Sequence, residues 1–356
     1  ALCLEKNLPF AVYRLPGSAQ PLFILQTGAA LQTLDSLENL PDQQGFLVAP
    51  FHRTEQRPVV LLQPDVIVED EEEAAEALKI AEALPALTVG NTSRFVAISE
   101  ADYKAQVEKI VSVIRDSNLR KAVLSRIRVE KLPASFAHAV TYQDLCARYP
   151  EAFVYLFNLP GQGTWMGASP ELLVRLNTDW VETMALAGTQ PSPTDGRPLT
   201  WDEKEIDEQA MVSDYIASCF RDFEVNNVIK SGPHTVEAGN LSHLRTTFRV
   251  SRSEMDRHLG TFIDLLHPTP AICGVPQLPT LHFLLELEPH DREYYCGYLG
   301  PWGLNNSSDL FVNLRCMKIS TSQAGLFVGG GITAGSDPEK EWRETVLKSE
   351  TLLTVM

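Results

Sequence analysis

The chain has 356 residues, of which 44% are hydrophobic and 21% are charged, the balance of a globular protein with a sizeable core. Its 46 acidic and 30 basic side chains give a formal net charge of −16, which argues against an extended nucleic-acid interface. The six cysteines are scattered without a Cys-x-x-Cys pair, so a disulfide framework or a zinc cage is not expected, and the pattern favours a reducing compartment.

The N-terminal part of the chain predicts strands. Its first residues, ALCLEKNLPF, lack the order of a secretory signal, and no apolar run in the chain reaches the ~18 residues of a membrane span. We therefore expect a cytoplasmic protein that makes no membrane contact. Residues 8 to 65 alternate short β-rich runs with Pro, Gly and Asn turns, which predicts antiparallel strands. The acidic, alanine-rich run from 69 to 84 predicts a helix with a solvated face.

Regular elements continue to the end of the chain. A helix is predicted from Ser99, a candidate N-cap, to about Asp116, because apolar residues recur between them at helical spacing. From Lys121 to Val129 the pattern changes to period two. Further strands are predicted at 153–158, 164–168, 172–176, 180–186, 311–319 and 326–332. Further helices are predicted at about 202–221, 254–266, 277–288 and 338–353.

This order of elements predicts an α+β fold. Strands follow one another in runs, often with only a turn between them, so large antiparallel sheets packed together and flanked by helices are expected rather than a doubly wound parallel sheet. No Ser/Gly linker divides the chain and no internal repeat is present. We expect one domain over residues 1–356, with a strand-rich N-terminal part (1–90) and a part (91–356) that contains the candidate site residues.

Two acid pairs stand at i, i+3 spacing on predicted helices, Glu205 with Glu208 and Glu341 with Glu344. Residues three apart share a helix face, so each pair could direct two carboxylates at one point. Hard oxygen ligands of this kind suit Mg²⁺. The alternative is that the pairs are ordinary solvated charges on the surface of an acidic protein.

Glycines 329 to 331 precede the second acid pair. A nucleotide-phosphate loop is not indicated, because the run ends Gly-Ser-Asp-Pro instead of Gly-Lys-Ser/Thr. Glycines weaken a strand unless something approaches its backbone closely, so a small anion could be held there with help from Lys348 and a metal. A glycine-rich strand end followed by a turn is the alternative.

Three other residues could take part in chemistry. Burial of Lys121 on its strand face would favour the neutral amine, which could act as a base, although a lysine at a strand end is more often solvated. Glu171 occupies a Ser-Pro turn where a carboxyl could act as an acid or simply start a helix. Arg315 could clamp a carboxylate. Together these residues indicate a Mg²⁺-dependent site for a small carboxylate, and they leave the substrate open.

Ten segments in order give the chain a strong resemblance to the chorismate-utilising enzymes, which include isochorismate, salicylate, anthranilate (component I) and aminodeoxychorismate synthases. The resemblance covers roughly residues 90 to 356 and is loose before that. The segments are KAVLSR, GASPELLVRL, LAGTQP, DEKEIDEQAMV, SHLRTTF, LHPTPAICGVP, DREYYCGYLG, VNLRCMKI, GGGI and EWRETVLK.

The resemblance implies roles for individual residues. Lys121 and Glu171 match the general base and general acid. Glu208 and Glu344 match direct ligands of Mg²⁺, while Glu205 and Glu341 would act through waters or by supporting those ligands. Positions that hold the carboxylates of chorismate are matched by Arg315, Lys348, Gly329, Gly331, Gly188 and Thr189, and Tyr295 and His243 match the pocket wall.

Within this family the LHPTPA segment is similar to the isochorismate synthases. Ala187 stands where the aminodeoxychorismate enzymes have a nucleophilic lysine, which argues against that activity, and Gln190 replaces a common arginine. The expected activity is therefore isomerisation of chorismate to isochorismate, with no redox cofactor and no glutaminase subunit. Salicylate synthase and a non-catalytic chorismate-binding module are the alternatives.

Overall fold

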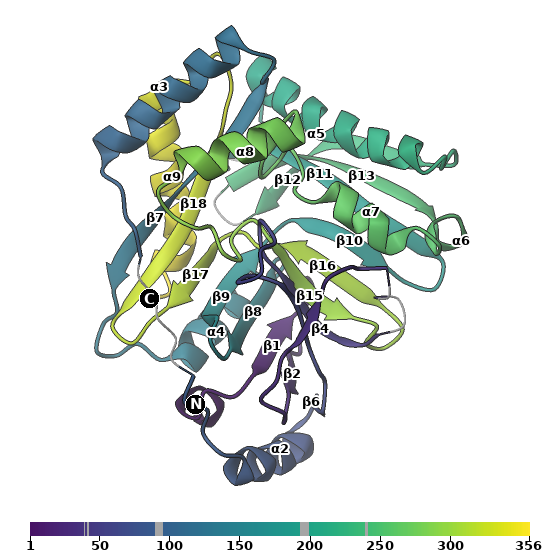
Figure 1. The fold of residues 1–356 in the computed structure, drawn as a ribbon, viewed down its shortest axis with the longest axis vertical. Helices are drawn as coiled ribbons and strands as arrows, with labels where there is room; N and C mark the ends of the chain where they lie inside the picture. Colours follow the sequence, from purple (N-terminus) through teal and green to yellow (C-terminus); the bar gives the residue numbers. More distant parts are fainter. Residues whose placement is uncertain (39, 41–42, 90–94, 193–198, 239–240) are drawn as a thin grey trace.

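The computed structural model describes residues 1–38, 40, 43–89, 95–192, 199–238 and 241–356 (Figure 1). Their strands form two antiparallel nine-stranded sheets that lie against each other. The first sheet has the order β14 (Gly274–Val275), β7 (Lys121–Lys131), β18 (Gln323–Ile332), β17 (Cys316–Ile319), β9 (Gly163–Ser169), β8 (Phe153–Leu159), β1 (Phe10–Arg14), β2 (Leu22–Leu25) and β6 (Val66–Val68).

The second sheet has the order β12 (Ile229–Ala238), β13 (Leu241–Ser251), β11 (Trp180–Pro191), β10 (Leu172–Leu176), β16 (Ser308–Val312), β15 (Tyr298–Trp302), β4 (Gly45–Ala49), β5 (Val59–Leu62) and β3 (Gln32–Leu34). N-terminal strands therefore join both sheets. The predicted α+β fold with two packed antiparallel sheets is confirmed. The expected boundary at residue 90 lies outside the described residues.

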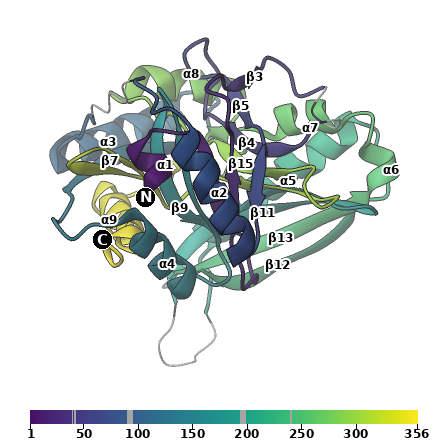
Figure 2. The same ribbon diagram turned by 90° about the horizontal axis from the view of Figure 1, so that it is seen from below.

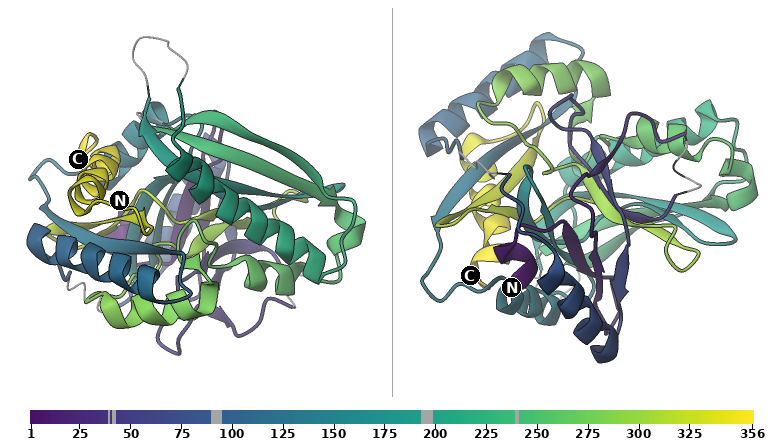
Figure 3. Two further views of the ribbon diagram at one scale, coloured as in Figure 1. Left: turned by 90° about the horizontal axis from the view of Figure 1, so that it is seen from above. Right: turned by 60° about the horizontal axis from the view of Figure 1, so that its bottom comes forward.

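Helices cover the outer faces of the sheets. They are α1 (Leu2–Glu5), α2 (Glu71–Ala83), α3 (Glu100–Asp116), α4 (His138–Arg148), α5 (Glu203–Asp222), α6 (Arg252–Met255), α7 (Leu259–Leu266), α8 (Gln277–Leu287) and α9 (Pro338–Leu353). In Figure 2, where the molecule is seen from below, α2 lies in front of the strands, and Figure 3 shows α5 running along the strands β11 and β13. Among the described residues, no helix is both long enough and apolar enough to cross a bilayer.

The core between the sheets is aromatic. Phe153 of β8 and Phe311 of β16 stack in parallel across the two sheets, with ring centroids 4.3 Å apart. Tyr13 of β1 packs against Phe46 of β4 in the same layer, at 5.5 Å. Such pairs bury large apolar surfaces and prefer these geometries, so they hold the sheets in register.

Helix α3 confirms its prediction in detail. The Ser99 hydroxyl accepts a hydrogen bond from the amide of Asp102, as an N-cap does. The apolar residues at helical spacing, Tyr103, Val107, Ile110, Val111 and Ile114, are its buried residues. Tyr103 also packs against Trp342 of α9, at 5.6 Å between ring centroids, so α3 supports the helix that carries the second acid pair.

Two predicted elements were wrong as continuous units. The strand expected at 311–319 is broken between β16 and β17, because Arg315 has a φ of +49° and the chain there crosses from one sheet to the other. The helix expected at 254–266 is split into α6 and α7. Helix α4 and the long strands β12 and β13 were not predicted at all.

Candidate active site

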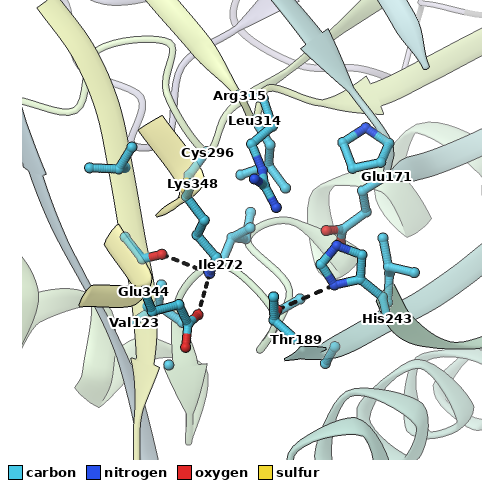
Figure 4. Close-up of a pocket in the computed structure, with 18 of the residues that line it drawn as sticks. Val123, Glu171, Thr189, His243, Ile272, Cys296, Leu314, Arg315, Glu344 and Lys348 are labelled. Carbon is cyan, nitrogen blue, oxygen red and sulfur yellow. Dashed lines mark hydrogen bonds and ion pairs between the residues drawn. The ribbon is translucent and has the colours of Figure 1, made fainter. Parts of the chain in front are cut away.

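A cavity lies where both sheets, helices α5 and α9 and the loop after α7 meet (Figure 4). Eleven of the predicted residues line it: Glu171, Gly188, Thr189, Glu208, His243, Tyr295, Arg315, Gly329, Gly331, Glu344 and Lys348. In Figure 4, Glu344 and Lys348 stand on one side of the cavity and Glu171 and His243 on the other. The fold thus gathers residues that are up to 177 positions apart in the sequence, from Glu171 to Lys348.

Two chain crossovers between the sheets position Glu171 and Arg315. The turn after β9 leads to β10 of the other sheet, and the segment after β16 leads back to β17. Backbone hydrogen bonds tie the crossovers together: the Val312 amide donates to the Glu171 carbonyl (2.9 Å), and the Ala168 amide donates to the Arg315 carbonyl (3.1 Å). A carboxyl and a guanidinium are therefore fixed at the same rim of the cavity by backbone contacts.

Glu171 is suited to hold a proton. The side chain is 3% exposed, and desolvation raises its pKa to about 8, although the charges of Lys121 and Lys348 act in the opposite direction. A carboxyl with such a pKa is mostly protonated at neutral pH. The alternative of a helix-start carboxylate is not observed, since Glu171 lies in the turn between β9 and β10.

His243 presents a neutral imidazole. Burial and the nearby charge of Arg315 lower its pKa to about 3. Its Nδ1 lies 2.9 Å from the Gly188 carbonyl oxygen, so Nδ1 carries the proton and donates this bond. Its Nε2 is buried without a hydrogen-bond partner among the described residues, which leaves one acceptor at the cavity wall.

The glycine run makes room for charged side chains. A β carbon on Gly331 would lie 2.5 Å from Glu208 Oε1 and 2.9 Å from Lys121 Cε. A β carbon on Gly330 would lie 3.3 Å from Glu341 Oε2 and 3.6 Å from Glu344 Oε1. The groups that closely approach these glycines include the carboxylates from α5 and α9, and the small anion expected there stays a prediction.

Lys121 is fully buried beneath this glycine run. Its Nζ lies 2.9 Å from Glu208 Oε1, an ion-pair distance, although no hydrogen bond of good geometry ends on Nζ among the described residues. Desolvation alone would raise the pKa of Glu208, but the charge of Lys121 lowers it. Lys121 is not part of the cavity lining and reaches the cavity at Gly331.

The other two carboxylates next to the glycines, those of Glu344 and Glu341, also form ion pairs with lysines. Glu344 Oε1 lies 2.6 Å from Lys348 Nζ, which also donates to the Gly329 carbonyl at 2.9 Å. Glu341 Oε1 lies 2.9 Å from Lys204 Nζ. Burial and then the charge of Glu344 raise the pKa of Glu341, an effect that Lys204 opposes. Neighbouring carboxylates that repel one another are a setting in which a cation is favoured.

Helix α9 is held on the first sheet by a buried arginine. Arg126 of β7 donates from Nε to Thr345 Oγ1 at 2.8 Å and lies over the Trp342 ring, 4.0 Å from its centroid. Both contacts fall between Glu341 and Glu344 or directly beside them. The position of the second acid pair is therefore fixed by β7, the same strand that begins with Lys121.

The carboxylates around the glycine run offer oxygen ligands for a divalent cation. Among the described residues, no three His, Cys, Asp or Glu side chains already surround one ion position. However, Glu205 Oε2 and Glu341 Oε2 are buried without a hydrogen-bond partner in that part of the chain. Orphaned carboxylate oxygens on two adjoining helices are costly without a partner, and they suit a hard cation. The residues therefore fit Mg²⁺, provided that the lysines give up some of these contacts.

Sequence reasoning missed several residues of the site. Lys204 lies within the DEKEIDEQAMV segment but received no role. Apolar walls come from Val123, Leu186, Ile272, Leu314 and Phe327, which no charge pattern could have indicated. His267, in the LHPTPAICGVP segment, has Nε2 3.2 Å from the Phe51 carbonyl oxygen and packs against Tyr298, so its role is structural.

Comparison with known proteins identifies the class. A family model described as chorismate binding enzyme matches residues 42–356. Because the match covers most of the chain, the protein belongs to the chorismate-binding enzyme family. The structure is similar to that of MenF, the menaquinone-specific isochorismate synthase from Escherichia coli, with a TM-score of 0.79 over 100% of this chain and 91% of that chain. Their 23% identity supports a shared fold alone.

Sequence relatives include enzymes of two activities. The isochorismate synthase EntC of Escherichia coli K12 is 30% identical over 72% of this chain and 67% of its own length. Anthranilate synthase component 1 of Streptomyces coelicolor is 31% identical over 73% of this chain and 52% of its own length. Identity alone therefore does not separate the activities of these two relatives.

Proposed function

We propose that this protein is an isochorismate synthase that converts chorismate to isochorismate with Mg²⁺. The observation that supports this most directly is the pair formed by Lys121 and Glu171. Lys121 is a buried amine that reaches the cavity at Gly331, and Glu171 is a carboxyl in the cavity wall whose pKa is raised to about 8. A reaction that adds one hydroxyl and expels another requires a base and an acid of this kind.

In this proposal Lys121 accepts a proton from the water that attacks C2 of the ring. Glu171 donates its proton to the C4 hydroxyl, which leaves as water while the double bond shifts. The reaction balances, because one water enters at C2 and one water leaves from C4. Arg315 and Lys348 hold carboxylates of the substrate, and the Nε2 acceptor of His243 receives a substrate or water hydrogen.

The metal would be held by Glu208 and Glu344, with Glu205 and Glu341 supporting it. When bound, Mg²⁺ supplies positive charge that positions a carboxylate and stabilises the charge that develops during displacement. Gly188, Thr189, Tyr295, Gly329 and Gly331 complete the walls around the substrate. No glutaminase partner is required, since water is the nucleophile.

The second candidate is salicylate synthase, which would go on to eliminate pyruvate in the same pocket. Incubation with chorismate and Mg²⁺, followed by chromatography of the products, separates the two. We expect a reversible mixture of chorismate and isochorismate, with little pyruvate by lactate dehydrogenase coupling. Stoichiometric pyruvate with fluorescent salicylate would instead assign the lyase activity. An aminated product formed only with ammonia would assign the anthranilate branch.

A further inference from the structure

Lys204 connects the two helices that carry the acid pairs. It lies on α5, directly before Glu205, and its Nζ is 2.9 Å from Glu341 Oε1 on α9. The Glu341 side chain is 2% exposed, whereas the Lys204 side chain is 39% exposed. One end of this ion pair is therefore fixed inside the protein, and the other end has a path to solvent.

The three lysines at the acid cluster differ in this freedom. The side chains of Lys121 and Lys348 are 0% and 17% exposed. Lys348 is also bound to the Gly329 carbonyl, 2.9 Å away. Apart from its contact with Glu341, Lys204 makes no hydrogen bond or ion pair within the described part of the chain. Of the three lysines, Lys204 can therefore leave its carboxylate with the smallest loss of other contacts and the easiest access to solvent.

The carboxylate that Lys204 neutralises faces the proposed metal position. Glu341 Oε2 has no hydrogen-bond partner among the described residues and lies close to Gly330, as does Glu344 Oε1. Two carboxylates that share this space repel each other. An ammonium on Glu341 relieves part of that repulsion, and a divalent cation would relieve it more completely.

We propose that Lys204 is a displaceable internal counter-ion of the metal site. Without a divalent cation its ammonium stabilises the buried Glu341 and holds α5 against α9. Binding of the cation moves the Lys204 side chain into solvent, so Lys204 competes with the metal and weakens its affinity. The identity of the cation as Mg²⁺ rests on the proposed function, but the competition itself concerns the ion pair between two residues of this chain.

The test is direct metal binding by the full-length, metal-stripped protein without substrate. Isothermal titration calorimetry with Mg²⁺, and with Mn²⁺ by electron paramagnetic resonance, would compare wild type with Lys204→Met. Removal of one charge a few ångströms from the ion is expected to tighten binding about fivefold or more. Lys204→Arg, which keeps the charge, should bind within about threefold of wild type.

A second measurement keeps the proposal falsifiable if the variant is unstable. Metal-stripped Lys204→Met should melt at a lower temperature than wild type, and Mg²⁺ should raise its melting temperature by more. Lys340→Met is the matched control, because Lys340 is exposed on α9 and its side chain has no partner among the described residues. It should leave both measurements near wild type.

The outcomes separate the two proposals. Wild type that binds Mg²⁺ with Lys204→Met binding equally or more weakly overturns the counter-ion role and leaves the proposed function standing. An equal change in Lys204→Met and Lys340→Met also overturns it, because a general charge effect would then explain the data. Wild type that binds no divalent cation and makes no isochorismate overturns the proposed function together with this inference.

Discussion

The carboxylate of Glu208 on α5 lies directly against the backbone of Gly331 on β18, so close that a β carbon on Gly331 would stand 2.5 Å from Glu208 Oε1. The same β carbon would stand 2.9 Å from Lys121 Cε. A single backbone position thus controls the distance between a candidate metal ligand and the candidate base. Any residue other than glycine at position 331 would carry a β carbon that pushes these two side chains away.

Gly331→Ala is expected to reduce kcat/KM by about 10²-fold or more, because displacement of a reacting group by ~1 Å can cost that much. Gly335→Ala is the matched control, since a β carbon at Gly335 meets nothing within 4 Å. The measurement is steady-state isochorismate formation, with circular dichroism to verify folding. Near-normal activity of Gly331→Ala would show that Glu208 and Lys121 need not approach this strand.

Glu171→Gln is expected to lower kcat by ~10²–10⁴-fold, the range for a lost general acid, and Lys121→Gln should do the same for the base. Because the acid must be protonated and the pKa of Glu171 is about 8, wild-type kcat/KM should fall as the pH rises through about 8. The residual kcat/KM of Glu171→Gln should not show this fall at alkaline pH. Glu350→Gln, a change at an exposed residue of α9, is the control. It should keep the wild-type kcat and the wild-type fall of kcat/KM at alkaline pH.

The same carboxyl predicts a stability effect of defined sign. Its folded-state pKa of about 8 exceeds the ordinary glutamate value of 4.5, so the folded protein binds this proton more tightly than the unfolded chain. The contribution of Glu171 to stability is then fully present below about pH 4.5 and is lost as the pH rises to about 8. Glu171→Gln cannot ionise, so urea unfolding should find it more stable than wild type at pH 8.5, on the order of a few kcal/mol. Equal stability of the two proteins at pH 8.5 would contradict the raised pKa.

Removal of the metal is expected to stop turnover. EDTA should abolish isochorismate formation by wild type, and added Mg²⁺ should restore it. Glu208→Gln and Glu344→Gln should be inactive at ordinary Mg²⁺ concentrations while they keep the wild-type circular dichroism spectrum. Full turnover in EDTA would remove Mg²⁺ from the proposed mechanism.

Local patterns in the sequence predicted most of the elements. The period-two run from Lys121, the N-cap at Ser99 and the helix from 338 to 353 all agree with the structure, since each depends on contacts within a few residues. The continuous strand expected from 311 to 319 was wrong, because β16 and β17 belong to different sheets. At Arg315 the chain leaves one sheet for the other, and no local signal marks that change.

The sequence by itself determined which residue types make up the site and which family they resemble. These residues are two acid pairs at helical spacing, a glycine run, a lysine on a strand and a carboxyl in a tight turn. Their chemistry was decided by the tertiary structure. Burial by segments far apart in the chain raises the pKa of Glu171, and approach of α5 to β18 brings Glu208 against Lys121. Desolvation and ion pairing depend on distances in space, so the sequence could name these groups, but only the packed sheets and helices determine which of them hold a proton, a cation or each other.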